Sequence, residues 1–141
     1  MILRTEDSLC DKNAPKISCK ENGMEYIANN PDRSFDVRKY QLDGELVKME
    51  TCCDYLVIND TKQKAYYIEL KGKDIKHAVE QVLAGEKICR DSLERYISYY
   101  RIVPHKSPAI NLFPTNYKHL LAKVGPERLK CKNKRLEETL N

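Results

Sequence analysis

The sequence predicts a mixed α/β fold built around one sheet, because the spacing of its apolar residues changes along the chain. Before residue 74, short apolar and β-branched runs are separated by turn-forming residues, as in strand hairpins. After that point helical spacing and short strand-like runs alternate. The chain has 141 residues, of which 41% are hydrophobic and 33% charged, and it shows no internal repeat. These values predict a single domain over 1–141.

Residues 35–42 predict the first strand of a hairpin. Their side chains partly alternate between apolar and polar, and they end at Asp43-Gly44, a dipeptide that favours tight hairpins because both positions accept positive φ. A partner strand is then expected over 45–49. The thirty or so residues before this hairpin are only weakly patterned.

A second hairpin is predicted over residues 53–70. An apolar run covers 53–59, a turn-like stretch follows over 60–63, and 65–70 are rich in aromatic and β-branched residues. We expect this hairpin to close at Gly72.

Helical spacing begins after Asp74, which is a suitable N-cap. The expected helix extends to about Cys89. Its apolar stripe consists of Ile75, Ala78, Val79, Val82 and Leu83.

The next predicted element is a strand over 97–103, where tyrosines flank an apolar run that Pro104 stops. A loop is expected over 104–114. Helical spacing then returns over 115–124 and ends before Gly125.

The last residues predict a short strand and a terminal element. Leu129 and Cys131 alternate with lysines, as in a strand that is buried on one side. Residues 136–140 are expected to form a turn or a helix.

Three charged residues interrupt or end the apolar strands of the second hairpin: Asp54, Glu69 and Lys71. Charges in a core hairpin normally lie on the solvent face, so this placement needs an explanation. If the chain reverses at 61–63, paired residue numbers sum to about 125. Asp54 then lies opposite Lys71, and Leu56 opposite Glu69. All three charged groups are expected at one end of the hairpin, on one face.

Such an arrangement has the chemistry of a divalent-metal site. The carboxylates of Asp54 and Glu69, with the backbone carbonyl of Leu70, supply the oxygen ligands that Mg²⁺ prefers. Lys71 would position or activate the water that attacks a phosphodiester. Gln81, on the flank of the following helix, is expected to orient water or a phosphate oxygen. A salt-bridge cluster without function is the structural alternative.

An aspartate, a Glu-x-Lys about fifteen residues later in a strand, and a following helix with a glutamine resemble the PD-(D/E)XK nuclease superfamily. The sequence looks most like its small, standalone, mostly uncharacterised bacterial members, and the resemblance covers 35–103. Four segments carry it: Val37–Gly44, Cys53–Leu56, Ile68–Gly72 and Ala78–Gln81.

This resemblance implies a restriction-endonuclease-like αβββαβ core, whose first helix would come from the N-terminal region. It also implies Mg²⁺- or Mn²⁺-dependent cleavage of nucleic acid. Asp54 and Glu69 would be the metal ligands, Lys71 the catalytic lysine and Gln81 an accessory catalytic residue.

Two features depart from the superfamily pattern. Cys53 stands where a proline precedes the aspartate in that pattern. Many members also add an acidic residue from the first helix, and the sequence leaves several candidates open: Glu6, Glu21 and Glu25, with Glu45 and Glu50 as strand-borne alternatives.

The net charge of +4 is small, but basic residues gather in two regions. We expect them to form a positive rim that binds phosphate around the metal site: Arg38, Lys39, Arg128, Lys130, Lys132, Lys134 and Arg135. A solvated surface is the alternative for the C-terminal run. His105 and Lys106 lie in a predicted loop, for which phosphate contact and an ordinary polar role both stay open.

The cysteines, the lengths of the apolar runs and the first residues indicate the cellular compartment. Six cysteines without C-x-x-C spacing argue against a disulfide framework and against zinc. The longest apolar runs have four residues, far fewer than a membrane-spanning helix needs, and the first residues contain no signal-peptide core. We therefore expect a cytoplasmic protein.

The leading hypothesis is a divalent-metal-dependent nuclease that hydrolyses phosphodiester bonds in DNA, with structure-dependent or nonspecific recognition. Dimerisation would suit cutting of both strands, which is easiest with two sites. One alternative is a catalytically silent nuclease-like fold that binds nucleic acid or a protein partner as a regulator or inhibitor. Another is a scaffold that only mediates assembly. Metal dependence and replacement of Lys71 distinguish these hypotheses.

Overall fold

The computed structural model describes residues 3–48, 50–70 and 74–141. Within them the chain forms eight strands and two α-helices, which confirms the mixed α/β class. The strands are β1 (Lys16–Glu21), β2 (Met24–Asn29), β3 (Val37–Gln41), β4 (Tyr55–Asn59), β5 (Lys64–Glu69), β6 (Ile97–Ile102), β7 (Leu129–Cys131) and β8 (Arg135–Thr139). The helices are α1 (Ile75–Cys89) and α2 (Thr115–Val124).

The central element is a five-stranded sheet in the order β3-β4-β5-β6-β7. β3, β4 and β5 are antiparallel neighbours, whereas β6 runs parallel to β5 and β7 parallel to β6. The crossover from β5 to β6 contains α1, as a parallel pair requires. Three antiparallel strands, a helix and a parallel strand therefore follow one another, as in the later part of an αβββαβ core.

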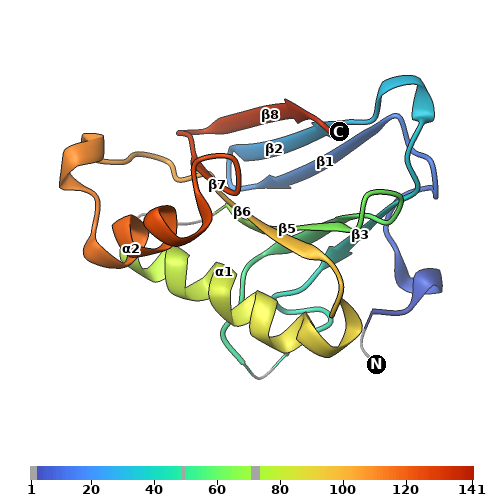
Figure 1. The fold of residues 1–141 in the computed structure, drawn as a ribbon, viewed down its shortest axis with the longest axis horizontal. Helices are drawn as coiled ribbons and strands as arrows, with labels where there is room; N and C mark the ends of the chain where they lie inside the picture. The colour runs from blue at the N-terminus through green and yellow to red at the C-terminus, as the bar shows by residue number, and fades with distance from the viewer. Residues whose placement is uncertain (1–2, 49, 71–73) are drawn as a thin grey trace.

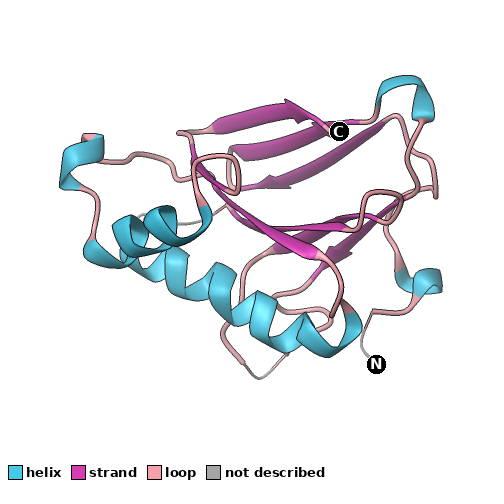
Figure 2. Ribbon diagram, viewed as in Figure 1, coloured by secondary structure: helices cyan, strands magenta, loops and turns pink. Residues whose placement is uncertain are grey.

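The molecule has three layers, which Figures 1 and 2 show in the same view. α1 and α2 cover one face of the five-stranded sheet, and a second sheet of β1, β2 and β8 covers the other. The apolar run of β4 is unbroken because its side chains alternate between the two faces of the sheet and both faces are covered. Leu56 and Ile58 pack with the helices, while Tyr55 and Val57 pack with the second sheet.

The predicted helix after Asp74 is α1, and its start is capped as expected. The Asp74 carboxylate accepts hydrogen bonds from the backbone N–H groups of Lys76 and His77, at 3.0 and 3.4 Å. The predicted strand over 97–103, the helix over 115–124 and the short strand around residue 130 are also present, as β6, α2 and β7.

The expectation of a helix in the N-terminal region is wrong. The helix expected at the start of the αβββαβ core is absent from residues 3–36, where the chain instead forms the β1–β2 hairpin and short 3-10 turns over Thr5–Asp7 and Pro31–Arg33. The buried side chains of β1 and β2, among them Ile17 and Tyr26, cover the five-stranded sheet in place of a helix.

The expected strand over 45–49 is wrong as well, since residues 45–48 contain no strand. Asp43-Gly44 does form a turn, with a φ of 83° at Gly44. The chain then turns back on itself, so that the N–H of Val47 donates to the carbonyl of Leu42 at 2.8 Å. β3 pairs with β4, whose residues are all buried, whereas Glu45 and Lys48 of the stretch after Gly44 are exposed.

The expected terminal turn or helix over 136–140 is a strand. β8 pairs in parallel with β2, and Leu136 and Leu140 are buried in the core between the sheets. The β2 edge supplies backbone partners that a helix would not use.

A buried ionic network links the two sheets. Arg101 of β6 is only 2% exposed, and it donates hydrogen bonds to Glu138 of β8 at 2.7 and 3.2 Å. The hydroxyl of Tyr26 also donates to this carboxylate, at 2.6 Å. The rings of Tyr66 and Tyr99 lie 5.4 and 5.5 Å from the guanidinium carbon of Arg101. The charge of Arg101 is therefore compensated inside the fold.

Neither α1 nor α2 is long and apolar enough to cross a membrane, and the described residues contain no other α-helix.

Candidate functional site

The structure brings two carboxylates together at one end of the β4–β5 hairpin. Asp54 directly precedes β4, and Glu69 is the last residue of β5. The backbone N–H of Leu70 donates to Oδ2 of Asp54 at 2.9 Å, which ties the two strand ends together. Asp54 is 3% exposed and Glu69 is 1% exposed. Both acids are thus held inside the protein, at the ends of apolar strands.

The register of this hairpin differs from the predicted one by two residues. Tyr55 pairs with Ile68 and Leu56 pairs with Tyr67, so paired residue numbers sum to 123. Leu56 is therefore not opposite Glu69. Continued by one residue, the observed register sets Asp54 across from Glu69. A shift by two keeps every side chain on its face, so both carboxylates stay on the α1 side of the sheet.

Lys71, the expected catalytic lysine, lies outside the described residues, as does Gly72. The described neighbours on either side are Leu70, whose N–H contacts Asp54, and Asp74, which caps α1.

The donors at this strand end fit a hard divalent cation. Asp54 and Glu69 offer carboxylate oxygens and Leu70 a backbone carbonyl, and oxygen ligands of these kinds are what Mg²⁺ and Mn²⁺ take. Nowhere in 3–48, 50–70 and 74–141 do three His, Cys, Asp or Glu side chains converge on one metal position. The described residues at this strand end can therefore supply two carboxylates and one backbone carbonyl as ligands, and water would complete the coordination.

Gln81 lines a hollow of about 440 Å³ between the start of α1 and the loop before β4. The lining reaches Cys52, two residues before Asp54, but includes neither Asp54 nor Glu69. The hollow is lined by Asp43, Lys48, Glu50, Thr51, Cys52, His77 and Gln81. Four of these residues come from the loop between β3 and β4: Lys48, Glu50, Thr51 and Cys52. Only Lys48 belongs to the 45–49 stretch that the sequence pattern assigns to a strand.

Cys52 connects the hollow to the carboxylates. Burial, together with the nearby negative charges of Asp43, Glu69 and Asp54, raises the pKa of its thiol to about 12. Cys52 is therefore a neutral thiol at physiological pH, and three carboxylates act on it electrostatically. Asp43 is a candidate site residue that the sequence reasoning missed. Its place in the Asp43-Gly44 turn accounted for it without reference to function.

The candidates for an additional acidic residue now separate by position. Glu50 lines the hollow with Gln81. Glu6 pairs with Arg4 on the surface, and Glu25 pairs with Lys20 and Arg135 in the second sheet. Glu21 ends β1 in that same sheet, and Glu45 is exposed in the turn after Gly44.

The two basic residues of β3 do not form one surface. Arg38 and Lys39 are successive strand residues, so their side chains point to opposite faces of the sheet. Nζ of Lys39 donates to the carbonyl of Ser18 and lies 5.4 Å from the ring centre of Tyr55.

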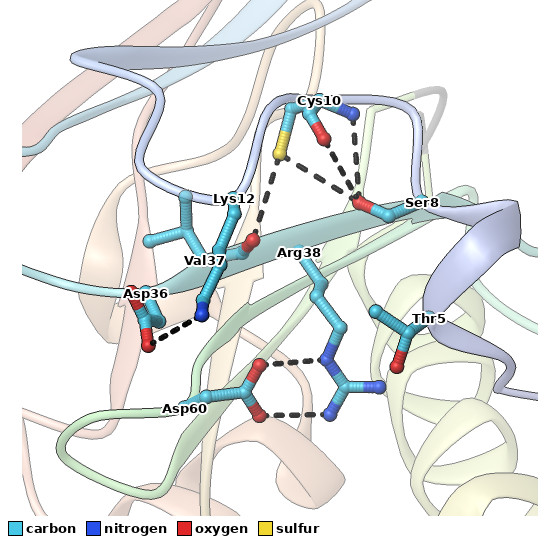
Figure 3. A pocket seen from close by; sticks show the side chains of 8 residues that line it. All are labelled: Thr5, Ser8, Cys10, Lys12, Asp36, Val37, Arg38 and Asp60. Atoms are coloured by element: carbon cyan, nitrogen blue, oxygen red, sulfur yellow. Dashed lines mark hydrogen bonds and ion pairs between the residues drawn. The ribbon is translucent and has the colours of Figure 1, made fainter.

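Arg38 belongs to a separate hollow of about 250 Å³ at the other end of β3 and β4 (Figure 3). Its guanidinium donates two hydrogen bonds to Asp60, at 2.7 and 2.8 Å. The hydroxyl of Tyr96 donates to the same carboxylate at 2.6 Å. Asp60 follows β4 at the end away from Asp54, so the structure separates Arg38 from the paired carboxylates.

The C-terminal basic residues divide into two groups. Arg128 donates to the carbonyl of Ser98 at 2.8 Å. Lys130 lies 3.6 Å from Glu138, and Arg135 is ion-paired with Glu25 and Glu137. Lys132 and Lys134 are exposed, and no ion pair involves either of them among the described residues.

Comparison of the chain with protein-family models, with curated proteins and with solved structures finds no match in any of the three.

Proposed function

We propose that this protein is a divalent-metal-dependent nuclease of the PD-(D/E)XK type that hydrolyses phosphodiester bonds in DNA. The observation that carries the proposal is the pairing of two buried carboxylates, Asp54 and Glu69, at adjacent strand ends. The N–H of Leu70 fixes the orientation of the Asp54 carboxylate. The strand, strand, helix, strand order around them supports it.

The energetics favour a functional reading of this pair. Removing a carboxylate from water is costly, and a buried ion pair adds little stability compared with apolar side chains of similar size. Two carboxylates at one strand end attract a divalent cation, which would support hydrolysis by polarising the phosphate and the attacking water.

Each residue then has a defined part. Asp54 and Glu69 hold the cation, with the Leu70 carbonyl as a further oxygen ligand. Lys71 positions the attacking water and stabilises charge on the phosphate. Gln81, next to Glu50 in the hollow beside α1, orients a water molecule or a phosphate oxygen from the other side.

Cleavage assays with conservative variants test the proposal. Linear and circular DNA, single- and double-stranded, is incubated with Mg²⁺, Mn²⁺ or EDTA. Asp54→Asn keeps an oxygen that accepts from Leu70, and Glu69→Gln and Lys71→Met keep side-chain size. We expect metal-dependent cutting by the wild type and a loss of at least 100-fold in each variant. Lys87→Met, on an exposed position of α1, is the matched control and should cut normally.

Binding of Mn²⁺, measured by calorimetry, completes the test. Wild-type protein that neither cuts any substrate nor binds the ion would contradict the proposal. That outcome would favour the alternative of a nuclease-like protein that binds its partner without cleavage.

A further inference from the structure

The carboxyl ends of the three parallel strands β5, β6 and β7 lie side by side, and we call the side of the sheet that they form its carboxyl edge. The strand register aligns Glu69 of β5 with Ile102 of β6, and Ile102 with Cys131 of β7. The segments that follow these three residues therefore leave the sheet side by side, at the edge where the paired carboxylates lie. In open α/β sheets this edge is where ligands commonly bind.

Backbone hydrogen bonds hold the segments after β6 and β7 against each other. The N–H of Val103 donates to the carbonyl of Glu69 at 2.8 Å, and the N–H of Lys132 donates to that of Ile102 at 3.1 Å. The N–H of Lys134 donates to the carbonyl of Pro104 at 2.9 Å.

Two further contacts anchor this pair of segments. The carbonyl of Lys134 accepts from the N–H of Glu25 in β2, at 2.9 Å. The hydroxyl of Ser107 is 2.8 Å from Oδ1 of Asn133. The two segments are thus positioned as one surface next to Glu69, although about thirty residues separate them in the sequence.

This surface carries three exposed lysines, which we call the edge cations: Lys106, Lys132 and Lys134. His105, next to Lys106, is exposed as well. In the part of the chain that the structure describes, none of these side chains forms an ion pair with a carboxylate. His105 and Lys106 also line a shallow hollow of about 430 Å³ with Ser107 and Pro108.

Several other basic residues are engaged within the fold. Arg38 is bound to Asp60, Arg101 to Glu138, and Arg135 to Glu25 and Glu137. The edge cations share their availability for an external anion with other exposed lysines, such as Lys62, Lys87 and Lys123, and differ from these in lying on the segments that follow the carboxyl ends of β6 and β7.

We infer that the edge cations bind the sugar-phosphate backbone of the nucleic-acid strand whose scissile phosphate lies at Asp54 and Glu69. The inference rests on the proposed nuclease function and adds where the substrate is held. Lysine ammonium groups contact phosphate as point charges and read no base edge, so binding is independent of sequence and strongly dependent on salt. His105 contributes a further donor at the same surface.

Metal-free binding measurements test this inference. The probes are fluorescein-labelled random-sequence DNAs of about twenty nucleotides, single- and double-stranded, titrated by anisotropy in EDTA at several salt concentrations. The edge variant replaces Lys106, Lys132 and Lys134 by Gln. The control variant replaces Lys62, Lys87 and Lys123 by Gln, which removes the same charge from exposed positions elsewhere. Circular dichroism melting checks that both variants fold.

We expect the edge variant to bind at least tenfold more weakly than the wild type, with a salt slope reduced by about one for each lysine replaced. The control variant should retain wild-type affinity to within about threefold, since it loses charge only away from the edge. Glu69→Gln should still bind while it does not cut.

Two outcomes would overturn the inference. In one, the edge and control variants bind equally; in the other, the wild type binds neither probe. Failure of the proposed function looks different, because DNA would then bind through the three lysines while Mg²⁺ or Mn²⁺ produced no cleavage.

Discussion

Gly85 sets how closely α1 approaches the sheet. It is buried in the middle of α1, and a Cβ at this position would lie 2.6 Å from Sγ of Cys53 and 3.5 Å from Cδ1 of Tyr67. Cys53 directly precedes Asp54, so the contact that fixes the helix also fixes the strand end that carries the candidate metal ligand. A glycine is needed here for space and not for backbone freedom.

Replacement of Gly85 by alanine should therefore destabilise the protein. Alanine favours the helix by about 1 kcal/mol over glycine, but the clash with Cys53 outweighs this gain, and we expect a net loss of about 1–3 kcal/mol. Urea denaturation of Gly85→Ala measures the loss. Cys53→Ala in the same chain removes the clashing sulfur, so the double variant should be more stable than the sum of the two single changes predicts. Additive effects would contradict this account.

At the same scale, the sequence was sufficient to place Asp54 and Glu69 at one end of the hairpin and on one face, but it set Asp54 opposite Lys71 and so gave the wrong register. Charge at the ends of apolar strands is visible in sequence, and it identified both acids. The register depends on the turn, where Oδ1 of Asn59 accepts from the N–H of Lys62 and Gln63 has a φ of 54°. The loop covers 60–63, as the pattern predicts, but Asn59 pairs directly with Lys64 across it, so that paired residue numbers sum to 123 and not to 125.

At the scale of elements, the start of α1 depends on one side chain. Asp74 satisfies two N–H groups of the first turn, which presents His77 and Gln81 to the hollow beside the carboxylates.

Asp74→Ala should cost about 1 kcal/mol of folding free energy, because these N–H groups lose their acceptor. Chemical denaturation checks the value. Asp74→Ser restores a capping oxygen and should recover most of the loss, whereas equal destabilisation by alanine and serine would show that capping is not the cause.

The Glu138 carboxylate of β8 links the two sheets by binding Arg101 of β6. Because this carboxylate titrates, the stability of the protein depends on pH. Burial raises the pKa of this carboxyl, but hydrogen bonds and charge from Arg101, with the Tyr26 hydroxyl, outweigh burial and hold it below its usual 4.5. A lowered pKa in the folded state stabilises the protein above pH 4.5, and this contribution is lost as the pH falls through the folded-state pKa.

Glu138→Gln should accordingly destabilise the protein by about 3 kcal/mol at pH 7, since it leaves Arg101 buried without its counter-charge. In denaturation experiments the difference from the wild type should shrink as the pH falls below 4.5. Glu94→Gln, at an exposed position that takes part in no ion pair among the described residues, is the control and should lack this pH-dependent difference. A constant difference across the pH range would refute the assignment.

Elements with local signatures are those that the sequence predicted correctly. The β4–β5 hairpin, α1, β6, α2 and β7 each show a periodic apolar pattern over their own length. β8 and the β1–β2 hairpin were missed or assigned to helix. The pairing of β8 with β2 joins residues more than one hundred positions apart, such as Glu25 with Arg135, and no local window contains that information. The β1–β2 hairpin is local, and its Asn22-Gly23 turn, with φ of 47° and 85°, is a signal that the sequence reasoning overlooked.

For the whole molecule, the proposed metal site predicts a link between ion binding and folding. Mg²⁺ or Mn²⁺ would bind the folded chain and not the unfolded one, so it should raise the melting temperature of the wild type, with a gain of about 2.7 kcal/mol at one hundred times Kd. Calorimetric melting with increasing Mn²⁺ measures this shift. Asp54→Asn and Glu69→Gln should show none, and a shift that persists in both variants would place the ion elsewhere.

The parallel pairing of β2 with β8 also has a consequence for biosynthesis. One edge of the β1–β2 hairpin stays uncovered until residues 135–139 have left the ribosome, because β8 is its partner there. Long-range parallel contacts form slowly, and an uncovered strand edge recruits other chains. A nascent or truncated chain that lacks β8 should therefore self-associate through β2, whereas a chain that includes β8 closes that edge itself.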